Sequence, residues 1–290
     1  MTGDLAIPTL DGVEHRHAQV GDLRMHYAEA GDPQADVVVL VHGWPQNWFI
    51  WRDLIGPLAE RFHVIAPDLR GLGWTEAPRR GYDKRQLAED VLSLLDEVGI
   101  GRVRWVGHDW GAFAGFHAAT LHPDRIERFM PCSVPHPWPP EGPPDPRRIL
   151  NAWYQFVLAA PLLGRLAIGT LDFHSQVLRS ARKRGEWGDE LDLYERAVKR
   201  PGYVDASIQY YRTFVLHEML PLARGQFRDR RLTVPTRLVV GTEDPVAKGL
   251  GDEFRDYADD MELEWVEGVG HFLPEERPEV LRELALGFLP

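Results

Sequence analysis

The feature that most constrains the fold of this chain is a series of short apolar runs separated by turn residues and longer stretches. Such runs are typical of strands buried on both faces of a sheet. They occupy residues 37–41, 63–66, 103–106 and 238–240. Between the second and third runs, residues 86–98 carry apolar side chains at helical spacing. This alternation predicts an α/β fold with a mostly parallel sheet covered by helices on both faces.

The N-terminal part of the chain has a different pattern. Residues 15–20 and 23–28 alternate more clearly between apolar and polar side chains, on either side of Gly21-Asp22. An alternation of period two is typical of strands with one solvated face. We therefore expect an antiparallel hairpin at one edge of the sheet.

A proline-rich segment interrupts the series. Residues 135–146 contain seven prolines, and because proline locks φ and cannot donate to a sheet ladder, we expect a stiff linker there. From residue 147 to about residue 220 the sequence is rich in Trp, Tyr, Phe and Leu and is interpreted as helical. A strand-like segment returns at residues 233–237.

A helical block that lies between two strands of one parallel sheet is naturally a cap over that sheet. We therefore expect an α/β core formed by residues 1–134 and 218–290, with a helical cap at residues 135–217. The chain of 290 residues is long enough for a core with such an insertion. The alternative is a separate C-terminal domain, which the returning strand-like segment disfavours.

Composition narrows the classes of partner and compartment. The net charge of −11 argues against a nucleic-acid partner. Cys132 is the only cysteine, so the chain has no intrachain disulfide, which fits a reducing compartment. Residues 1–11 have no signal-peptide pattern, and no apolar stretch has the length of a membrane span. We expect a cytoplasmic protein without membrane insertion and without a metal site.

The sharpest local motif is Gly107-His108-Asp109-Trp110-Gly111, which follows one apolar run and precedes a helix-like stretch at residues 112–121. Small residues two positions before and after a side chain allow a tight turn that exposes it at the end of a strand. The motif therefore predicts a nucleophile at Asp109. The alternative is an ordinary turn in which Asp109 caps the following helix.

Two downstream loops offer partners for such a nucleophile. Asp244 follows the apolar run that ends at Gly241, next to Glu243, which is the alternative acid. His271 lies in a glycine-rich loop before a predicted helix. The order nucleophile, acid, histidine is the order found in α/β hydrolases.

The motif around Asp109 resembles the nucleophile elbow of α/β hydrolases, with Asp in place of Ser. His42-Gly43-Trp44-Pro45 and residues 67–75 resemble loops of the epoxide hydrolase and haloalkane dehalogenase branch of that superfamily. The resemblance covers nearly the whole chain and is weaker in the cap. It implies Asp109 as nucleophile, His271 as general base and Asp244 as its orienting acid.

The same resemblance implies an oxyanion hole formed by the backbone N–H groups of Trp44 and Trp110, and it requires no cofactor or metal. His42 and His108 flank the predicted site, and we expect them to have structural roles. A carboxylate nucleophile suits displacement at a saturated carbon, because attack on a carbonyl would form an anhydride. Its leaving group is then a halide or the oxygen of a strained epoxide.

An epoxide oxygen needs a proton donor, and a tyrosine stays protonated at neutral pH. The segments around Tyr154 and Tyr211 resemble the two cap segments that carry the ring-opening tyrosines of epoxide hydrolases. The alternative for each tyrosine is that it is an aromatic packing residue on a cap helix. The resemblance thus implies conversion of a small lipophilic epoxide and water to a vicinal diol, through an alkyl ester on Asp109.

Two other functions stay open. A haloalkane dehalogenase would need N–H donors for the halide, and the indole of Trp110 with a cap tryptophan could supply them. A non-catalytic ligand-binding protein is also compatible with an α/β-hydrolase fold, because a fold does not fix a function. The oligomeric state is not predicted by the sequence.

Overall fold

A central sheet organises the protein in a computed structural model, which describes residues 5–140, 153–247 and 249–290. Among these residues the sheet has eight strands in the order β1-β2-β4-β3-β5-β6-β7-β8. The strands are β1 (Glu14–Val20), β2 (Leu23–Ala30), β3 (Val37–Val41), β4 (His63–Pro67), β5 (Val103–His108), β6 (Ile126–Cys132), β7 (Thr236–Gly241) and β8 (Met261–Val266). All four predicted apolar runs lie in strands, so the prediction of an α/β fold is confirmed.

Strand direction follows the two sequence patterns. The strands β3 to β8 pair in parallel, whereas β1 pairs antiparallel with β2, and β2 antiparallel with β4. Val20 pairs with Leu23 across Gly21, whose φ of 56° places it in the left-handed region. The predicted edge hairpin is therefore confirmed.

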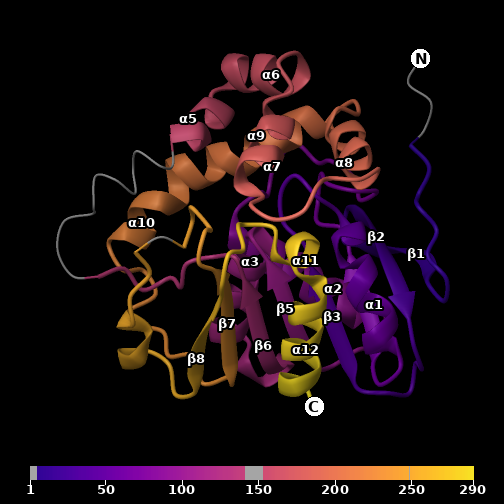
Figure 1. Ribbon diagram of the computed structural model, residues 1–290, viewed down its shortest axis with the longest axis vertical. Helices are drawn as coiled ribbons and strands as arrows, with labels where there is room; N and C mark the ends of the chain where they lie inside the picture. Colours follow the sequence, from indigo (N-terminus) through magenta and orange to yellow (C-terminus); the bar gives the residue numbers. More distant parts are fainter. Residues whose placement is uncertain (1–4, 141–152, 248) are drawn as a thin grey trace.

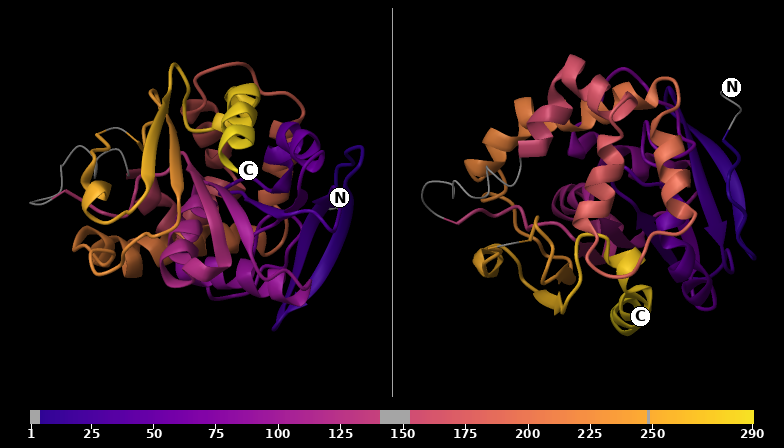
Figure 2. Two further views of the ribbon diagram at one scale, coloured as in Figure 1. Left: turned by 90° about the horizontal axis from the view of Figure 1, so that it is seen from below. Right: turned by 45° about the horizontal axis from the view of Figure 1, so that its top comes forward.

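Helices cover both faces of the sheet, as the view from below in Figure 2 shows. Helices α1 (Arg52–Ala59) and α12 (Pro278–Phe288) pack on one face, and α2 (Lys84–Glu97) and α3 (Trp110–Leu121) pack on the other. Each face has its own buried apolar cluster. The core thus has three layers, with the strands buried in the middle.

A second group of helices lies above one edge of the sheet (Figure 1). Its members are α5 (Trp153–Ala159), α6 (Pro161–Gly169), α7 (Phe173–Ala181), α8 (Glu190–Val198), α9 (Tyr203–Thr213) and α10 (Met219–Ala223). A π-helical turn, η3 (Phe214–Glu218), joins α9 to α10. We call α5 to α9 the upper helices. The prediction that this part of the chain is helical agrees with the described residues. Residues 141–152, which include half of the predicted linker, lie outside the described residues.

Short elements complete the chain: η1 (Trp48–Trp51), η2 (Pro123–Arg125), η4 (Glu253–Asp256) and α11 (Leu273–Glu276). Cys132, the last residue of β6, is buried in the cluster beneath α1 and α12. Within the described ranges, no helix is both long and apolar enough to span a membrane.

Two predicted boundaries were wrong. The strand expected at residues 233–237 begins only at Thr236, because Pro235 has no N–H to donate to the ladder. The helix expected at residues 86–98 begins two residues earlier, at Lys84. Asp83 caps it by accepting a hydrogen bond from the backbone N–H of Gln86 at 2.9 Å.

Candidate active site

Asp109 lies at a sharp turn between β5 and α3, with φ of 50° and ψ of −120°. A non-glycine residue in this region is strained, and such strain persists only where the surroundings enforce it. The flanking glycines make the turn possible. A Cβ atom on Gly107 would lie 2.6 Å from the carbonyl oxygen of Gly111, and one on Gly111 would lie 2.6 Å from the carbonyl carbon of Val41.

The Asp109 carboxylate does not serve as a cap for the helix that follows it. In the described structure its side chain makes no N-cap bond to the second or third residue of α3, so the alternative of an ordinary helix cap was wrong. Instead, Oδ2 accepts a hydrogen bond from the backbone N–H of Trp44 at 2.9 Å, and the backbone N–H of Trp110 also donates to the carboxylate. Two backbone donors from separate loops thus hold one carboxylate. The close approach requires Gly43, because a Cβ there would lie 2.5 Å from the Cβ of Asp109.

His271 and Asp244 meet beside this carboxylate. The Nδ1 atom of His271 lies 3.1 Å from Oδ2 and 3.2 Å from Oδ1 of Asp244, and its Nε2 atom lies 3.8 Å from Oδ1 of Asp109. Asp244 is fully buried, whereas the alternative acid, Glu243, is exposed. The structure therefore brings Asp109, His271 and Asp244 together in a line, and it leaves Glu243 out.

Burial and charge oppose each other at these groups. Burial disfavours the charged imidazolium, but the adjacent Asp244 carboxylate and the charge of Asp109 outweigh it and raise the pKa of His271 to about 9. Burial raises the pKa of Asp109, while the charge of His271 and the two backbone N–H donors act in the opposite direction. The arrangement therefore favours an imidazolium beside the carboxylate in the free protein.

His42 and His108 support the loops rather than the reacting atoms. His42 donates from Nδ1 to the carbonyl of Gly43 at 2.9 Å and accepts at Nε2 from the backbone N–H of Leu69 at 3.0 Å. His108 donates from Nε2 to the carbonyl of His271 at 2.8 Å. Burial, together with the nearby charge of His271, lowers the pKa of His108 to about 3, so it stays neutral.

The two predicted tyrosines come from the upper helices and lie next to each other. The ring centroids of Tyr154 in α5 and Tyr211 in α9 are 6.0 Å apart. Burial, followed by the charge of Asp109 among other causes, raises the pKa of Tyr154 to about 12, and burial raises that of Tyr211 well above its usual value. Both phenols are therefore held in the protonated form.

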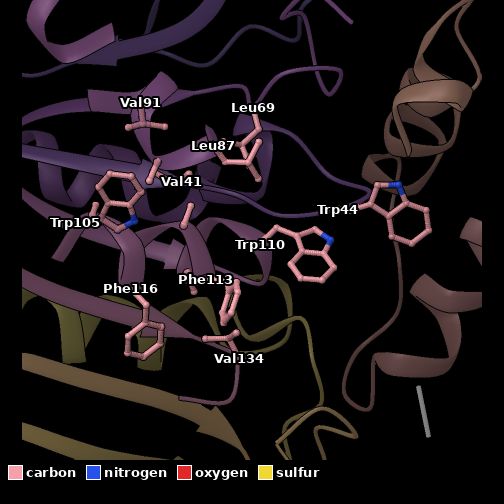
Figure 3. Close-up of a cluster of buried hydrophobic side chains, with 14 of the residues drawn as sticks. Val41, Trp44, Leu69, Leu87, Val91, Trp105, Trp110, Phe113, Phe116 and Val134 are labelled. Carbon is pink, nitrogen blue, oxygen red and sulfur yellow. The ribbon is translucent and has the colours of Figure 1, made fainter. Parts of the chain in front are cut away.

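Tyr211 packs edge-on against the two tryptophans whose backbone N–H groups donate to Asp109. Its ring centroid lies 5.0 Å from that of Trp44 and 5.8 Å from that of Trp110. Figure 3 shows these two tryptophans at the same end of the apolar cluster, away from Trp105 and Phe116. The tyrosines of the upper helices thus lie against the two loops that hold Asp109.

Comparisons with known proteins place the chain in a family. A family model for the α/β hydrolase fold matches residues 36–278. A soluble epoxide hydrolase of Corynebacterium sp. strain C12 is 33% identical, over 95% of this chain and 97% of that protein. The chain belongs to the epoxide hydrolase family of α/β hydrolases. Epoxide hydrolase A of Mycobacterium tuberculosis, 29% identical over 94% of this chain and 96% of that one, is a further relative.

The structure agrees with this membership of the epoxide hydrolase family. The solved epoxide hydrolase CorEH superposes with a TM-score of 0.84 at 31% identity, over 95% of this chain and 98% of that one. The predicted family and the predicted class, a hydrolase, are thereby confirmed. The protein is an enzyme of the hydrolase class.

Sequence reasoning missed one polar pair in this epoxide hydrolase family member. Lys84 is fully buried at the start of α2, and its ammonium lies 2.9 Å from Oε2 of Glu218. A Lys in the polar sequence before a helix is normally exposed, so no local signal pointed to its burial.

Sequence reasoning also missed Glu276, because its partners lie on another part of the chain. One carboxylate oxygen of Glu276 accepts from the backbone N–H groups of Lys183, Arg184 and Gly270 at 2.8 to 3.0 Å. The other accepts from the backbone N–H of Phe272 at 3.1 Å. Glu276 thereby ties the His271 loop to the segment that follows α7.

Proposed function

We propose that this hydrolase converts a lipophilic epoxide and water to a vicinal diol through an alkyl ester on Asp109. The observation that carries the proposal is the geometry of the Asp109 carboxylate. Oδ2 accepts from the backbone N–H of Trp44, while Oδ1 lies 3.8 Å from Nε2 of His271 and is the oxygen that we assign to the attack. The names of the relatives, soluble epoxide hydrolase and epoxide hydrolase A, support the choice of substrate class.

In the first step Oδ1 attacks one epoxide carbon, and the bond from that carbon to the epoxide oxygen breaks. The oxygen takes a proton from Tyr154 or Tyr211, both of which hold their phenol protons, and leaves a phenolate. The product is an ester of Asp109 that carries a β-hydroxyl group. We propose that the upper helices, within residues 135–217, act as the cap that supplies these donors to a core of residues 1–134 and 218–290.

In the second step His271 removes a proton from water, and the hydroxide attacks the ester carbonyl carbon of Asp109. Negative charge develops on Oδ2, to which Trp44 directs its backbone N–H group, and the Trp110 backbone N–H also donates to this carboxylate. Loss of one such donor typically raises a barrier by roughly 3 kcal/mol. Asp244 holds the imidazole in place and stabilises the imidazolium that forms. The intermediate then collapses: the bond between the carbonyl carbon and the ester oxygen breaks, the imidazolium protonates the departing diol, and the proton left on the Asp109 acid returns to the tyrosine phenolate.

The proposal is tested by following diol and bromide release from styrene oxide and 1-bromobutane in parallel. We expect diol without bromide. Bromide without diol would instead support a dehalogenase, with the Trp110 indole among the halide ligands. Neither product, together with reversible binding of styrene oxide, would favour the non-catalytic alternative.

Two variants test the covalent step. Asp109→Ala removes the nucleophile and is expected to abolish turnover, while Asp229→Ala, at an exposed position, keeps the parent rate. His271→Gln is expected to form the ester but not hydrolyse it, so intact mass spectrometry should show the protein plus one styrene oxide. Rapid multiple turnover by His271→Gln would contradict the assigned role.

A further inference from the structure

Lys84 occupies a position that helix stability and core packing do not explain. It is fully buried in the first turn of α2, where a positive charge opposes the helix dipole. Burying an ammonium costs several kcal/mol, even when it is paired. An apolar side chain of similar length would pack as well, so the contacts of the ammonium distinguish Lys84 from a packing residue.

The ammonium of Lys84 links the nucleophile loop to the helix that carries Tyr211. Its Nζ donates to the carbonyl of Tyr210 at 3.0 Å and lies 4.2 Å from the centroid of the Trp110 ring. Tyr210 directly precedes Tyr211, and Trp110 directly follows Asp109. One side chain therefore contacts the neighbour of the proposed proton donor and the neighbour of the proposed nucleophile.

The partner of Lys84 lies in the π-helical turn η3. Glu218, the last residue of η3, accepts from Nζ at 2.9 Å with one carboxylate oxygen and from the backbone N–H of Lys84 at 2.9 Å with the other. The carbonyl of Tyr210 lies where α9 passes into this turn, because it also accepts from the backbone N–H of Phe214. Short π-helical turns inside helices are frequent at functional sites.

We propose that Lys84, paired with Glu218, is a positioning residue that sets the Tyr211 phenol against Asp109 for epoxide ring opening. This inference rests on the proposed function. Lys84 acts through the backbone of α9 and the Trp110 ring, whereas ester hydrolysis depends on His271 and on the backbone N–H groups of Trp44, after β3, and Trp110, at the start of α3. Loss of the ammonium should therefore slow ester formation and leave ester hydrolysis unchanged.

The test resolves the two chemical steps with styrene oxide, by rapid quenching and intact mass spectrometry of the ester. In Lys84→Met we expect ester formation to slow by on the order of 10²-fold, as displacement of a reacting group by about 1 Å does. The rate of ester hydrolysis should equal that of the parent. Lys199→Met removes a partly exposed lysine paired with Asp172 and serves as the control that changes neither rate.

A neutral pair guards against misfolding caused by an unpaired buried charge. The double variant Lys84→Met/Glu218→Gln leaves no buried charge, and the amide oxygen can still accept from the backbone N–H of position 84. We expect it to form ester as slowly as Lys84→Met. A parent rate of ester formation in the double variant would overturn the inference, as would an equal loss in both steps.

A double-mutant cycle with Tyr211→Phe identifies the residue through which Lys84 acts. If Lys84 positions Tyr211, Lys84→Met should have little further effect on ester formation in the Tyr211→Phe background. Additive losses would overturn the inference. Failure of the parent protein to form any ester on Asp109 would count against the proposed function itself, whereas normal ester formation in both parent and Lys84→Met would count only against the role of Lys84.

Discussion

The protonation state of His271 should change during the proposed reaction, from an imidazolium in the free protein to a neutral base in the ester intermediate. Next to an ionised Asp109 its pKa is raised to about 9, although burial acts against the charged form. Esterification removes the negative charge of Asp109, so the pKa of His271 falls in the intermediate and the neutral base becomes available. The alkylation step thus releases the base that the hydrolysis step needs.

We predict that ester hydrolysis is slow at low pH, where His271 is protonated, and rises as pH increases through its pKa in the ester. Because that pKa lies below the value in the free protein, the rate should be half-maximal below pH 9. The measurement is single-turnover decay of the ester across the pH range. A half-maximal rate at or above pH 9 would contradict this linkage.

The two cap tyrosines should share the donation to the epoxide oxygen. We expect Tyr154→Phe and Tyr211→Phe each to slow ester formation by roughly 10²-fold, and the double variant nearly to stop it, with a loss of roughly 10⁴-fold, as typical for loss of general acid catalysis. Quenched-flow rates with styrene oxide measure the effect. Tyr257→Phe, at the position that follows η4 and outside residues 135–217, is the control. Parent rates in the double variant would refute tyrosine assistance.

Sequence reasoning located residues whose chemistry is tied to a strand end. Asp109 and Asp244 each follow a buried apolar run, and the carboxyl ends of parallel strands meet at one edge of a sheet. Lys84 could not be found in this way. Its partner Glu218 lies 134 residues further along the chain, and only the folded structure brings the two together.

At the scale of elements, Gly115 allows α3 to pack closely against the sheet at a position where alanine would ordinarily favour the helix. A Cβ on Gly115 would lie 2.7 Å from Cζ of Phe129 and 2.8 Å from Nε1 of Trp105. The helix propensity gained with alanine is about 1 kcal/mol. Overpacking a filled core costs about 1 to 3 kcal/mol.

We therefore predict that Gly115→Ala lowers the free energy of unfolding, measured by urea denaturation. Gly287→Ala is the matched control, because no atom lies within 4 Å of a Cβ at that exposed position in α12. There the propensity term acts alone, and stability should be unchanged or rise by up to about 1 kcal/mol. Stabilisation by both changes would show that α3 can move away from the sheet.

Helices and strands could be predicted where apolar side chains recur with one period over a long enough segment. The buried strands and helix α2 have clear patterns, and two of their boundaries differ from the prediction because Asp83 caps a helix and Pro235 excludes a strand. The upper helices have between seven and eleven residues each. Segments of two or three turns carry too little periodicity to be separated, so the sequence predicted a helical block without its divisions.

At the scale of the whole molecule, Glu276 joins the upper helices to the core through backbone N–H groups on both sides. We predict that Glu276→Gln lowers the free energy of unfolding, because an amide nitrogen cannot accept from these donors. One buried donor left unsatisfied costs about 1 to 3 kcal/mol.

The same substitution removes a negative charge that contributes to the raised pKa of His271, so that pKa should fall. Urea denaturation and NMR titration of His271 measure the two effects. Glu279→Gln, at an exposed carboxylate paired with Arg277, is the control and should change stability by less than about 0.5 kcal/mol. Equal stability of both variants would show that the link through Glu276 is dispensable.

The burial of Cys132 has a practical consequence for spectroscopy. Thiol reagents attack the thiolate, and burial at the end of β6 raises the pKa of this thiol, so the native protein should resist maleimides. Cysteines introduced at exposed sites, such as Leu162 on α6 and Gly287 on α12, would then take spin labels selectively. The distance between such a pair would report directly whether the upper helices swing away from the sheet when an epoxide enters.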